Sequence, residues 1–299
     1  MAFKTFIPSE LKIQDTHKMM LGAIAPRPIA FVSTISKNGE VNLSPYSFFN
    51  AFGANPPLVV FSPALRGRDG ATKHTLENVL EVGEAVINIV SYAMVQQMSL
   101  ASSEYPKGTN EFIKAGFTMQ ESSLVKPPRV QESPAQLECR VKDIIRTGER
   151  GGAGNLVICE IIAMHIREDV LDENGQIDPN RIDQVARLGG DWYTRARNGL
   201  FTVPKPLTTL GIGVDSLPDA IRLSTVLTGN DLGLLGNTEK LPTKEEIDAY
   251  AQREDVKNLL DTLREHNENS TIAVHIAARE LLRNGLVNEA WMLLLCKLS

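Results

Sequence analysis

The first residues that indicate chemistry are a lysine and a threonine at the expected start of a short helix. Lys73 and Thr75 form a Lys-x-Thr element, and the residues from Thr75 to Val82 have helical spacing, with Thr75 placed to cap the helix. Free backbone N–H groups and the helix dipole attract phosphate at such a position, and Lys73 would supply the countercharge. A capped helix beside a solvated lysine explains the same residues, so further evidence is needed for a phosphate site.

A second polar pair, Ser33 and Thr34, falls late in an expected strand. The stretch 27–36 alternates between two faces, and Asn38-Gly39 then leads into another strand-like run that contains Asn42. An Asn-Gly pair between strands predicts a tight antiparallel hairpin, because both residues tolerate positive φ. The hydroxyl and backbone groups of the pair can bond the polar edge of a ligand. The alternative is two polar residues on a half-buried strand.

His165 is the candidate acid–base residue. It ends an expected strand in which Cys159, Ile161 and Ala163 share its face, and this is typical of a packed, hydrogen-bonded histidine. The functional alternative is a proton donor or substrate contact. The three cysteines and five histidines show no metal-ligand spacing, so no metal site is expected. A Ser-His-Asp pattern is also missing from the sequence.

These residues need a scaffold, and its strands can be read from the sequence. Short β-rich runs at 58–62 and 85–90 are followed by longer ones at 136–146 and 155–167, which a glycine-rich turn at 148–154 joins. Many antiparallel strands with occasional helices indicate a mainly β fold, a closed or partly closed barrel. No GxGxxG follows a strand, so a dinucleotide-binding domain is not expected.

The last third of the chain is different in character. Thr243 and Glu246 form a capping box, Val256, Leu259 and Leu260 follow helical spacing, and Gly285 is placed to end a helix. We therefore predict a barrel domain over 1–205 and a helical extension over 206–299. The apolar segment 290–296 must be buried against the barrel, its sister helices or another subunit.

Composition excludes several classes of protein. The formal net charge of −5 and the pI of about 5.7 argue against a chain that grips nucleic acid through its overall charge. No apolar run is long enough to cross a membrane, and residues 1–10 do not resemble a secretory signal. The chain has 299 residues, and we expect it to be cytoplasmic.

Three separated motifs carry a resemblance to a known family. They read RPIAFVSTISKNGEVNLSPYSFFN from Arg27, then NPPLVVFSP, then KHT, and a further one reads ARLGGDWY up to Tyr193. In this order they resemble the flavin reductase-like FMN-binding split-barrel proteins, which include flavoredoxins and the reductase components of two-component flavin monooxygenases. The resemblance implies a split β-barrel with short helices that holds FMN.

The resemblance also implies which residues surround the flavin. The Lys73-x-Thr75 element would contact the phosphate, and Ser33 and Thr34 the pyrimidine edge. The remaining cofactor candidates are Arg27, Asn42, Ser44, Ser47, Phe48, Phe49 and Asn50. Arg187, Trp192 and Tyr193 would approach the pocket, either of their own subunit or of the partner subunit in a homodimer. The alternative is a turn anchored by two buried aromatics.

FMN can accept hydride without a protein nucleophile, so an FMN-dependent oxidoreductase with NAD(P)H as co-substrate is the first hypothesis. Its donor is a small molecule or a redox protein. The second hypothesis is a flavoredoxin-like electron carrier without direct NAD(P)H activity. The third is an FMN-binding regulatory or interaction protein in which the helical extension binds the partner.

Overall fold

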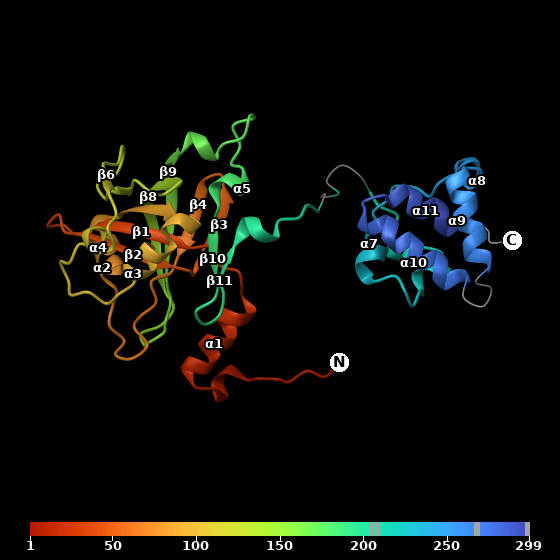
Figure 1. Ribbon diagram of the computed structural model, residues 1–299. Coiled ribbons are helices and arrows are strands. Elements are labelled where there is room, and N and C mark those ends of the chain that lie inside the picture. Colours follow the sequence, from red (N-terminus) through yellow and green to blue (C-terminus); the bar gives the residue numbers. More distant parts are fainter. Residues whose placement is uncertain (204–205, 207–209, 266–269, 297–299) are drawn as a thin grey trace. The chain divides into compact units, whose positions relative to one another are not determined.

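The computed structural model describes residues 1–203, 206, 210–265 and 270–296. The chain divides into two compact units, Met1–Phe201 (unit 1) and Thr202–Ser299 (unit 2) (Figure 1). The boundary predicted between residues 205 and 206 involves Lys205, which lies outside the described residues.

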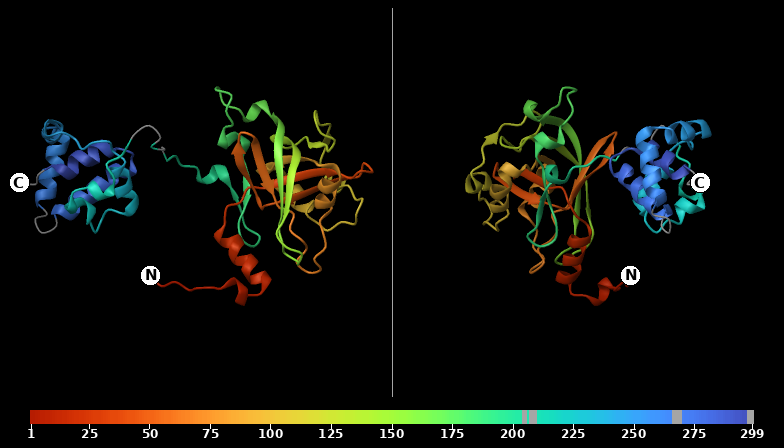
Figure 2. Two further views of the ribbon diagram at one scale, coloured as in Figure 1. Left: turned by 180° about the vertical axis from the view of Figure 1, so that it is seen from behind. Right: turned by 45° about the vertical axis from the view of Figure 1, so that its right-hand side comes forward.

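Unit 1 is built on one antiparallel sheet (Figures 1 and 2). Its seven strands, in the order β2-β1-β5-β8-β9-β4-β3, are β1 (Ala30–Ile35), β2 (Val41–Tyr46), β3 (Phe49–Ala54), β4 (Pro57–Phe61), β5 (Glu84–Ile89), β8 (Ala135–Arg146) and β9 (Asn155–Ile166). Two small ribbons pair β6 (Met119–Gln120) with β7 (Arg129–Val130) and β10 (Val185–Arg187) with β11 (Tyr193–Arg195). In the described residues β2 and β3 are the free edges, so hydrogen bonds do not close the sheet into a barrel.

Local sequence explains the two hairpins that organise this sheet. Asn38-Gly39 joins β1 to β2 as predicted, and Gly39 has a φ of 86° that favours glycine. The glycine-rich turn 148–154 joins β8 to β9, also as predicted. A Cβ on Gly151 would lie 2.8 Å from the carbonyl oxygens of Arg66 and Gly67, so only glycine lets these two loops approach.

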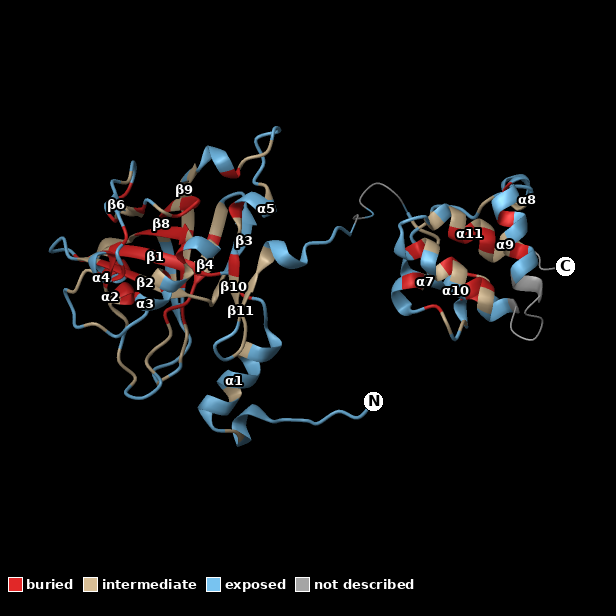
Figure 3. Cartoon of the chain, viewed as in Figure 1, coloured by how far each residue is buried: buried red, intermediate tan, exposed pale blue. Residues whose placement is uncertain are grey.

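Alternate residues of β1 enter two different hydrophobic cores. Val32 of β1 packs in the core that also holds Phe61 and Cys139, whereas its neighbour Phe31 packs in a second core with Phe112. The helices of unit 1 are α1 (Ile13–Ala23), α2 (His74–Val82), α3 (Val95–Leu100), α4 (Glu111–Ala115) and α5 (Pro179–Ile182). Helix α2 belongs to the first core, and α3 and α4 to the second, so helices pack on both faces of β1. Buried residues lie along β1 and in the helices near it (Figure 3).

Unit 2 is helical and has a core of its own. Its helices are α6 (Asp219–Arg222), α7 (Gly229–Gly236), α8 (Lys244–Ala251), α9 (Glu254–Glu265), α10 (Ser270–Arg283) and α11 (Val287–Leu295). The predicted capping box of Thr243 and Glu246 starts α8. The apolar segment 290–296 packs against its sister helices, with Trp291 fully buried and its indole N–H donating to the carbonyl of Leu235 (3.2 Å). In the described residues no helix is long and apolar enough to cross a bilayer.

One predicted local feature is wrong. Thr75 does not cap α2, because the helix begins at His74 and Lys73 is its N-cap residue, with no side-chain capping bond. The Thr75 hydroxyl instead donates to the Asn42 side-chain oxygen (2.7 Å) and accepts from the Tyr46 hydroxyl (2.8 Å). These two contacts to β2 leave Thr75 fully buried.

Candidate functional site

A small cavity of about 70 Å³ lies at the N-terminal end of α2. It is compact enough for a phosphate-sized group and too small for an aromatic ring. Its lining comes from β2, the loop that leads into α2, the segment after α3, and α4: Asn42, Ser44, Pro45, Tyr46, Arg66, Lys73, His74, Ser102, Ser103, Glu104, Tyr105 and Glu111. Asn42, Ser44 and Lys73 were predicted to be site residues, and the structure brings them together here.

Two cations on the wall make this cavity suitable for an anion. Lys73 precedes the first turn of α2, where the helix dipole favours negative charge. The Nε atom of Arg66 is buried and has no hydrogen-bond partner in the described part of the chain. A buried donor without a partner is costly, and an anionic ligand oxygen would satisfy it. His74, Ser102 and Ser103 add further hydrogen-bonding groups to the wall.

A directed chain of hydrogen bonds forms the floor of this cavity. Tyr46 donates to Thr75, Thr75 donates to Asn42, and the Asn42 amide donates to Glu111 Oε1 (3.0 Å). Glu111 is nearly fully buried, and its other oxygen accepts the backbone N–H of Leu43 (2.9 Å). Burial raises the pKa of Glu111 despite these bonds, and it raises the pKa of Tyr46 to about 12. Thr75 is not part of the lining, but its hydrogen bonds position Asn42 and Tyr46, which are.

A larger cavity of about 360 Å³ adjoins the small one and shares Pro45 and Ser102 with it. Its remaining lining is Ile29, Ser47, Met98, Ser99, Arg187, Asp191 and Tyr193. The guanidinium of Arg187 stacks over the Tyr193 ring, with 4.6 Å from the guanidinium carbon to the ring centroid. The structure thus brings together three more predicted residues: Ser47, Arg187 and Tyr193.

Trp192 lies on the turn between β10 and β11 and is 76% exposed. The alternative reading of this turn, two buried aromatics as its anchors, is therefore wrong for Trp192. The turn is held instead by the backbone N–H of Leu188, which donates to the carbonyl of Trp192 (3.0 Å).

Arg27 is buried, and its side chain joins three segments of the chain by hydrogen bonds. Its guanidinium donates to the carbonyls of Leu21 (2.7 Å), Ile24 (2.6 Å) and Leu188 (3.0 Å). Burial, and then the nearby charge of Arg187, lower its pKa. Arg27 thus fixes the end of α1 to the turn that borders the larger cavity.

Phe48, Phe49 and Asn50 lie elsewhere. They line a third cavity of about 780 Å³, formed by α1, β3, β4 and the loops near 65–67 and 152–154. Its lining is mainly apolar, and His17 of α1 meets the Phe48 ring edge-on at 6.2 Å between centroids. Flavin contacts from these three residues stay a prediction.

Ser33 and Thr34 are fully buried, and protein partners occupy their hydroxyls. Ser33 Oγ donates to the carbonyl of Pro128, while Thr34 Oγ1 accepts from the Asn78 amide (3.0 Å). Pro128 belongs to residues 121–130, a segment that crosses the sheet and that we call the strap. Contacts of Ser33 and Thr34 with a flavin also stay a prediction.

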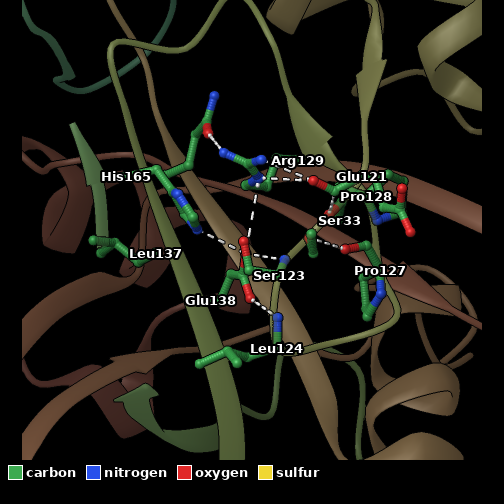
Figure 4. Close-up of polar contacts among 12 residues, drawn as sticks. Ser33, Glu121, Ser123, Leu124, Pro127, Pro128, Arg129, Leu137, Glu138 and His165 are labelled. Carbon is green, nitrogen blue, oxygen red and sulfur yellow. Dashed lines mark hydrogen bonds and ion pairs between the residues drawn. The ribbon is translucent and has the colours of Figure 1, made fainter. Parts of the chain in front are cut away.

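A buried carboxylate holds the strap to the sheet (Figure 4). Glu138 of β8 has no solvent exposure, and its two oxygens accept the backbone N–H groups of Ser123 (2.7 Å) and Leu124 (2.6 Å). His165 Nε2 lies 2.7 Å from Glu138 Oε1, and Arg129 Nε lies 3.8 Å from the same oxygen. Burial alone would raise the pKa of Glu138, but the two N–H bonds and His165 outweigh it, so the pKa is lowered.

His165 is therefore hydrogen-bonded and shares its face with Ala163 as predicted, but the prediction is wrong for Cys159 and Ile161. Register pairs Cys139 with Ile161 and Glu138 with Ala163, so an extra residue of β9 forms a bulge between them. Since Glu138 and Cys139 point to opposite faces, the bulge places His165 on the face opposite Ile161. A role as proton donor stays a prediction.

Nine residues of the small cavity were not predicted to be site residues: Pro45, Tyr46, Arg66, His74, Ser102, Ser103, Glu104, Tyr105 and Glu111. Arg66 had a signal, because it stands in an irregular, basic loop just before Lys73. Ser102 and Ser103 had none, since only the fold brings the end of α3 to this wall.

Comparison with known proteins gives a family match and similar solved structures. The model of the flavin reductase like domain matches residues 21–181. Nitrilotriacetate monooxygenase component B from Bacillus cereus is 31% identical with a TM-score of 0.63, over 68% of this chain and 99% of that chain. The 2-nitrobenzoate 2-nitroreductase of Pseudomonas fluorescens is 31% identical with a TM-score of 0.58, over 70% of this chain and 100% of that chain.

A protein with a split barrel domain from Shewanella frigidimarina is 26% identical, with a TM-score of 0.59, over 69% of this chain and 99% of that chain. The family match lies within unit 1 and confirms the resemblance predicted from the sequence motifs. The chain belongs to the flavin reductase-like family.

Proposed function

We propose that unit 1 is an FMN-binding oxidoreductase of flavin reductase type, with the FMN phosphate in the small cavity and the ring system in the larger one beside it. The observation that carries the proposal is the buried, unpartnered Nε of Arg66 next to Lys73 at the start of α2. Two cations, three serines and a helix start suit a phosphate. The adjoining cavity of about 360 Å³ has the size of a small ligand pocket.

Each lining residue then has a role. Arg66 and Lys73 neutralise the phosphate, and Ser44 and Ser103 donate hydrogen bonds to it. The Ser102 hydroxyl donates to the carbonyl of Ser99. In the larger cavity, Ser47 offers a hydroxyl, and the stacked Arg187 and Tyr193 present a flat cationic wall that orients the ring. Bound FMN would supply the capacity to accept hydride, and the protein positions it. Four of the predicted residues line neither cavity and would act indirectly, by holding the segments that do: Ser33, Thr34, Arg27 and Thr75.

The proposal includes a homodimer in a split-barrel arrangement. Helix α1 has no buried residue, although its Ile13 and Met20 are apolar. Strand β3 is a free edge of the sheet, and its Phe52 is 68% exposed. An exposed apolar edge and helix of this kind favour coverage by a second copy. A cytoplasmic location also remains part of the proposal.

A steady-state assay tests the reductase function. Purified protein with FMN is expected to oxidise NADH or NADPH, with the flavin or a further acceptor reduced in equal amount. Oxidation of neither nucleotide under any acceptor would contradict the reductase function and leave FMN binding to be judged separately. Fast reduction by a redox protein without nicotinamide oxidation would favour a flavoredoxin-like carrier.

A further inference from the structure

We propose that Glu104 is a specificity residue that competes with the flavin phosphate for Lys73 and so weakens FMN retention. The inference rests on the proposed function, because it concerns the same small cavity. It adds that FMN bound through this cavity is released readily rather than retained.

Glu104 stands on the cavity wall between two cations. Its Oε1 lies 4.0 Å from Lys73 Nζ, and its Oε2 accepts a hydrogen bond from Arg68 Nη2 at 2.6 Å. The Lys73 side chain is 34% exposed and that of Glu104 is 44% exposed, so both can turn toward a ligand or toward each other. Arg68 is outside the lining, so the Glu104 carboxylate is shared between one cation of the lining and one outside it.

The charges of the lining show why a carboxylate at this place matters. The strong cations that line the cavity are Arg66 and Lys73, and the carboxyl groups are Glu104 and Glu111. Both oxygens of Glu111 accept N–H groups of the protein, from Asn42 and Leu43, and these donors offset its negative charge. Glu104 is half exposed, and its carboxylate pairs with Lys73 and Arg68. Its negative charge therefore opposes the binding of a phosphate dianion.

A carboxylate that neutralises Lys73 lowers the gain from binding phosphate, because the phosphate must displace it. The Glu104 carboxylate also repels the phosphate directly, because a cavity of this size holds the two negative charges only a few ångströms apart. Both effects weaken FMN binding. Riboflavin has the same ring and no phosphate. Its affinity should not depend on Glu104, so the two ligands separate a phosphate effect from a general effect on the pocket.

The test is a fluorescence titration of the full chain with FMN and with riboflavin. Glu104→Gln is expected to lower the Kd for FMN by about threefold to tenfold and to leave the Kd for riboflavin unchanged. The matched control is Glu173→Gln, which makes the same charge change at an exposed turn outside the cavity. It should leave both constants unchanged.

A second variant tests the idea from the opposite side. Arg68→Gln frees Glu104 to pair with Lys73, so it should raise the Kd for FMN by about twofold to threefold. Added to Glu104→Gln, it should have no further effect, because its action passes through Glu104. If Glu104→Gln fails to fold, as judged by thermal denaturation, Glu104→Ala replaces it in both titrations and in the double variant.

Three results would overturn the inference: an FMN Kd that stays constant or rises in Glu104→Gln, an equal change for riboflavin, or an effect of Arg68→Gln that persists in the double variant. If the unmodified chain binds riboflavin and FMN equally, the phosphate site itself fails. If it binds neither, the proposed function fails and the inference with it.

Discussion

Replacing Arg66 by methionine is expected to raise the Kd for FMN about tenfold to a hundredfold and to leave riboflavin binding unchanged. Methionine keeps much of the aliphatic stem and removes the charge and the buried Nε donor. A hydrogen bond to a charged group contributes about 1.5–3 kcal/mol, which gives this range. Because Nε has no partner in the described residues, its loss should cost little folding stability. Calorimetric titration with both ligands measures the change.

Arg150→Met is the matched control for this prediction. Arg150 is exposed on the turn between β8 and β9 and does not line the small cavity, so the variant removes one positive charge without touching the site. If Arg150→Met weakens FMN binding as much as Arg66→Met does, the effect comes from the change in net charge and not from the site. An unchanged FMN affinity in Arg66→Met would remove Arg66 from the site.

Replacing Glu138 by glutamine is expected to lower the free energy of unfolding of unit 1 by about 3–5 kcal/mol, the range for breaking a buried charge network. Glutamine has the same shape, but its NH₂ would face N–H groups of Ser123 or Leu124 that now point at a carboxylate oxygen. His165 and Arg129 would also lose their anionic partner. Urea denaturation at neutral pH measures the difference.

The contribution of Glu138 should depend on pH in a defined direction. Its pKa in the folded protein lies below the ordinary value of 4.5, so the stabilisation is fully present above that value and is lost as the pH falls through the folded-state pKa. The gap between the unmodified chain and Glu138→Gln should therefore close in acid.

Glu160→Gln is the control on the neighbouring strand β9. It breaks a partly exposed ion pair with Lys142 (3.0 Å) and should cost at most about 1 kcal/mol. A loss of equal size in both variants, or a gap for Glu138→Gln that does not change in acid, would show that the buried carboxylate does not hold the strap.

The features that could be predicted from the sequence are those that short stretches determine. The hairpin at Asn38-Gly39 follows from the positive φ that these residues tolerate. The capping box at Thr243 and the stop at Gly285 are equally local. Lys73 could be placed at a helix start for the same reason, although the helix begins one residue earlier than predicted.

The features that could not be predicted depend on contacts between distant segments. Ser33 is bonded to Pro128, which lies 95 residues away, and a strand pattern carries no information on that partner. Thr75 looked like a cap, but Asn42 and Tyr46 from another strand take its hydroxyl. The face of His165 depends on one bulge in β9, because a single extra residue reverses the alternation.

The most direct test of the phosphate site is a crystal structure of the full chain grown with FMN. We predict the phosphate within hydrogen-bond distance of Arg66 Nε and Lys73 Nζ, and the ring beside Ser47 and Tyr193. A phosphate bound elsewhere, such as in the large apolar cavity beside α1, with Arg66 Nε still without a partner, would contradict the assignment.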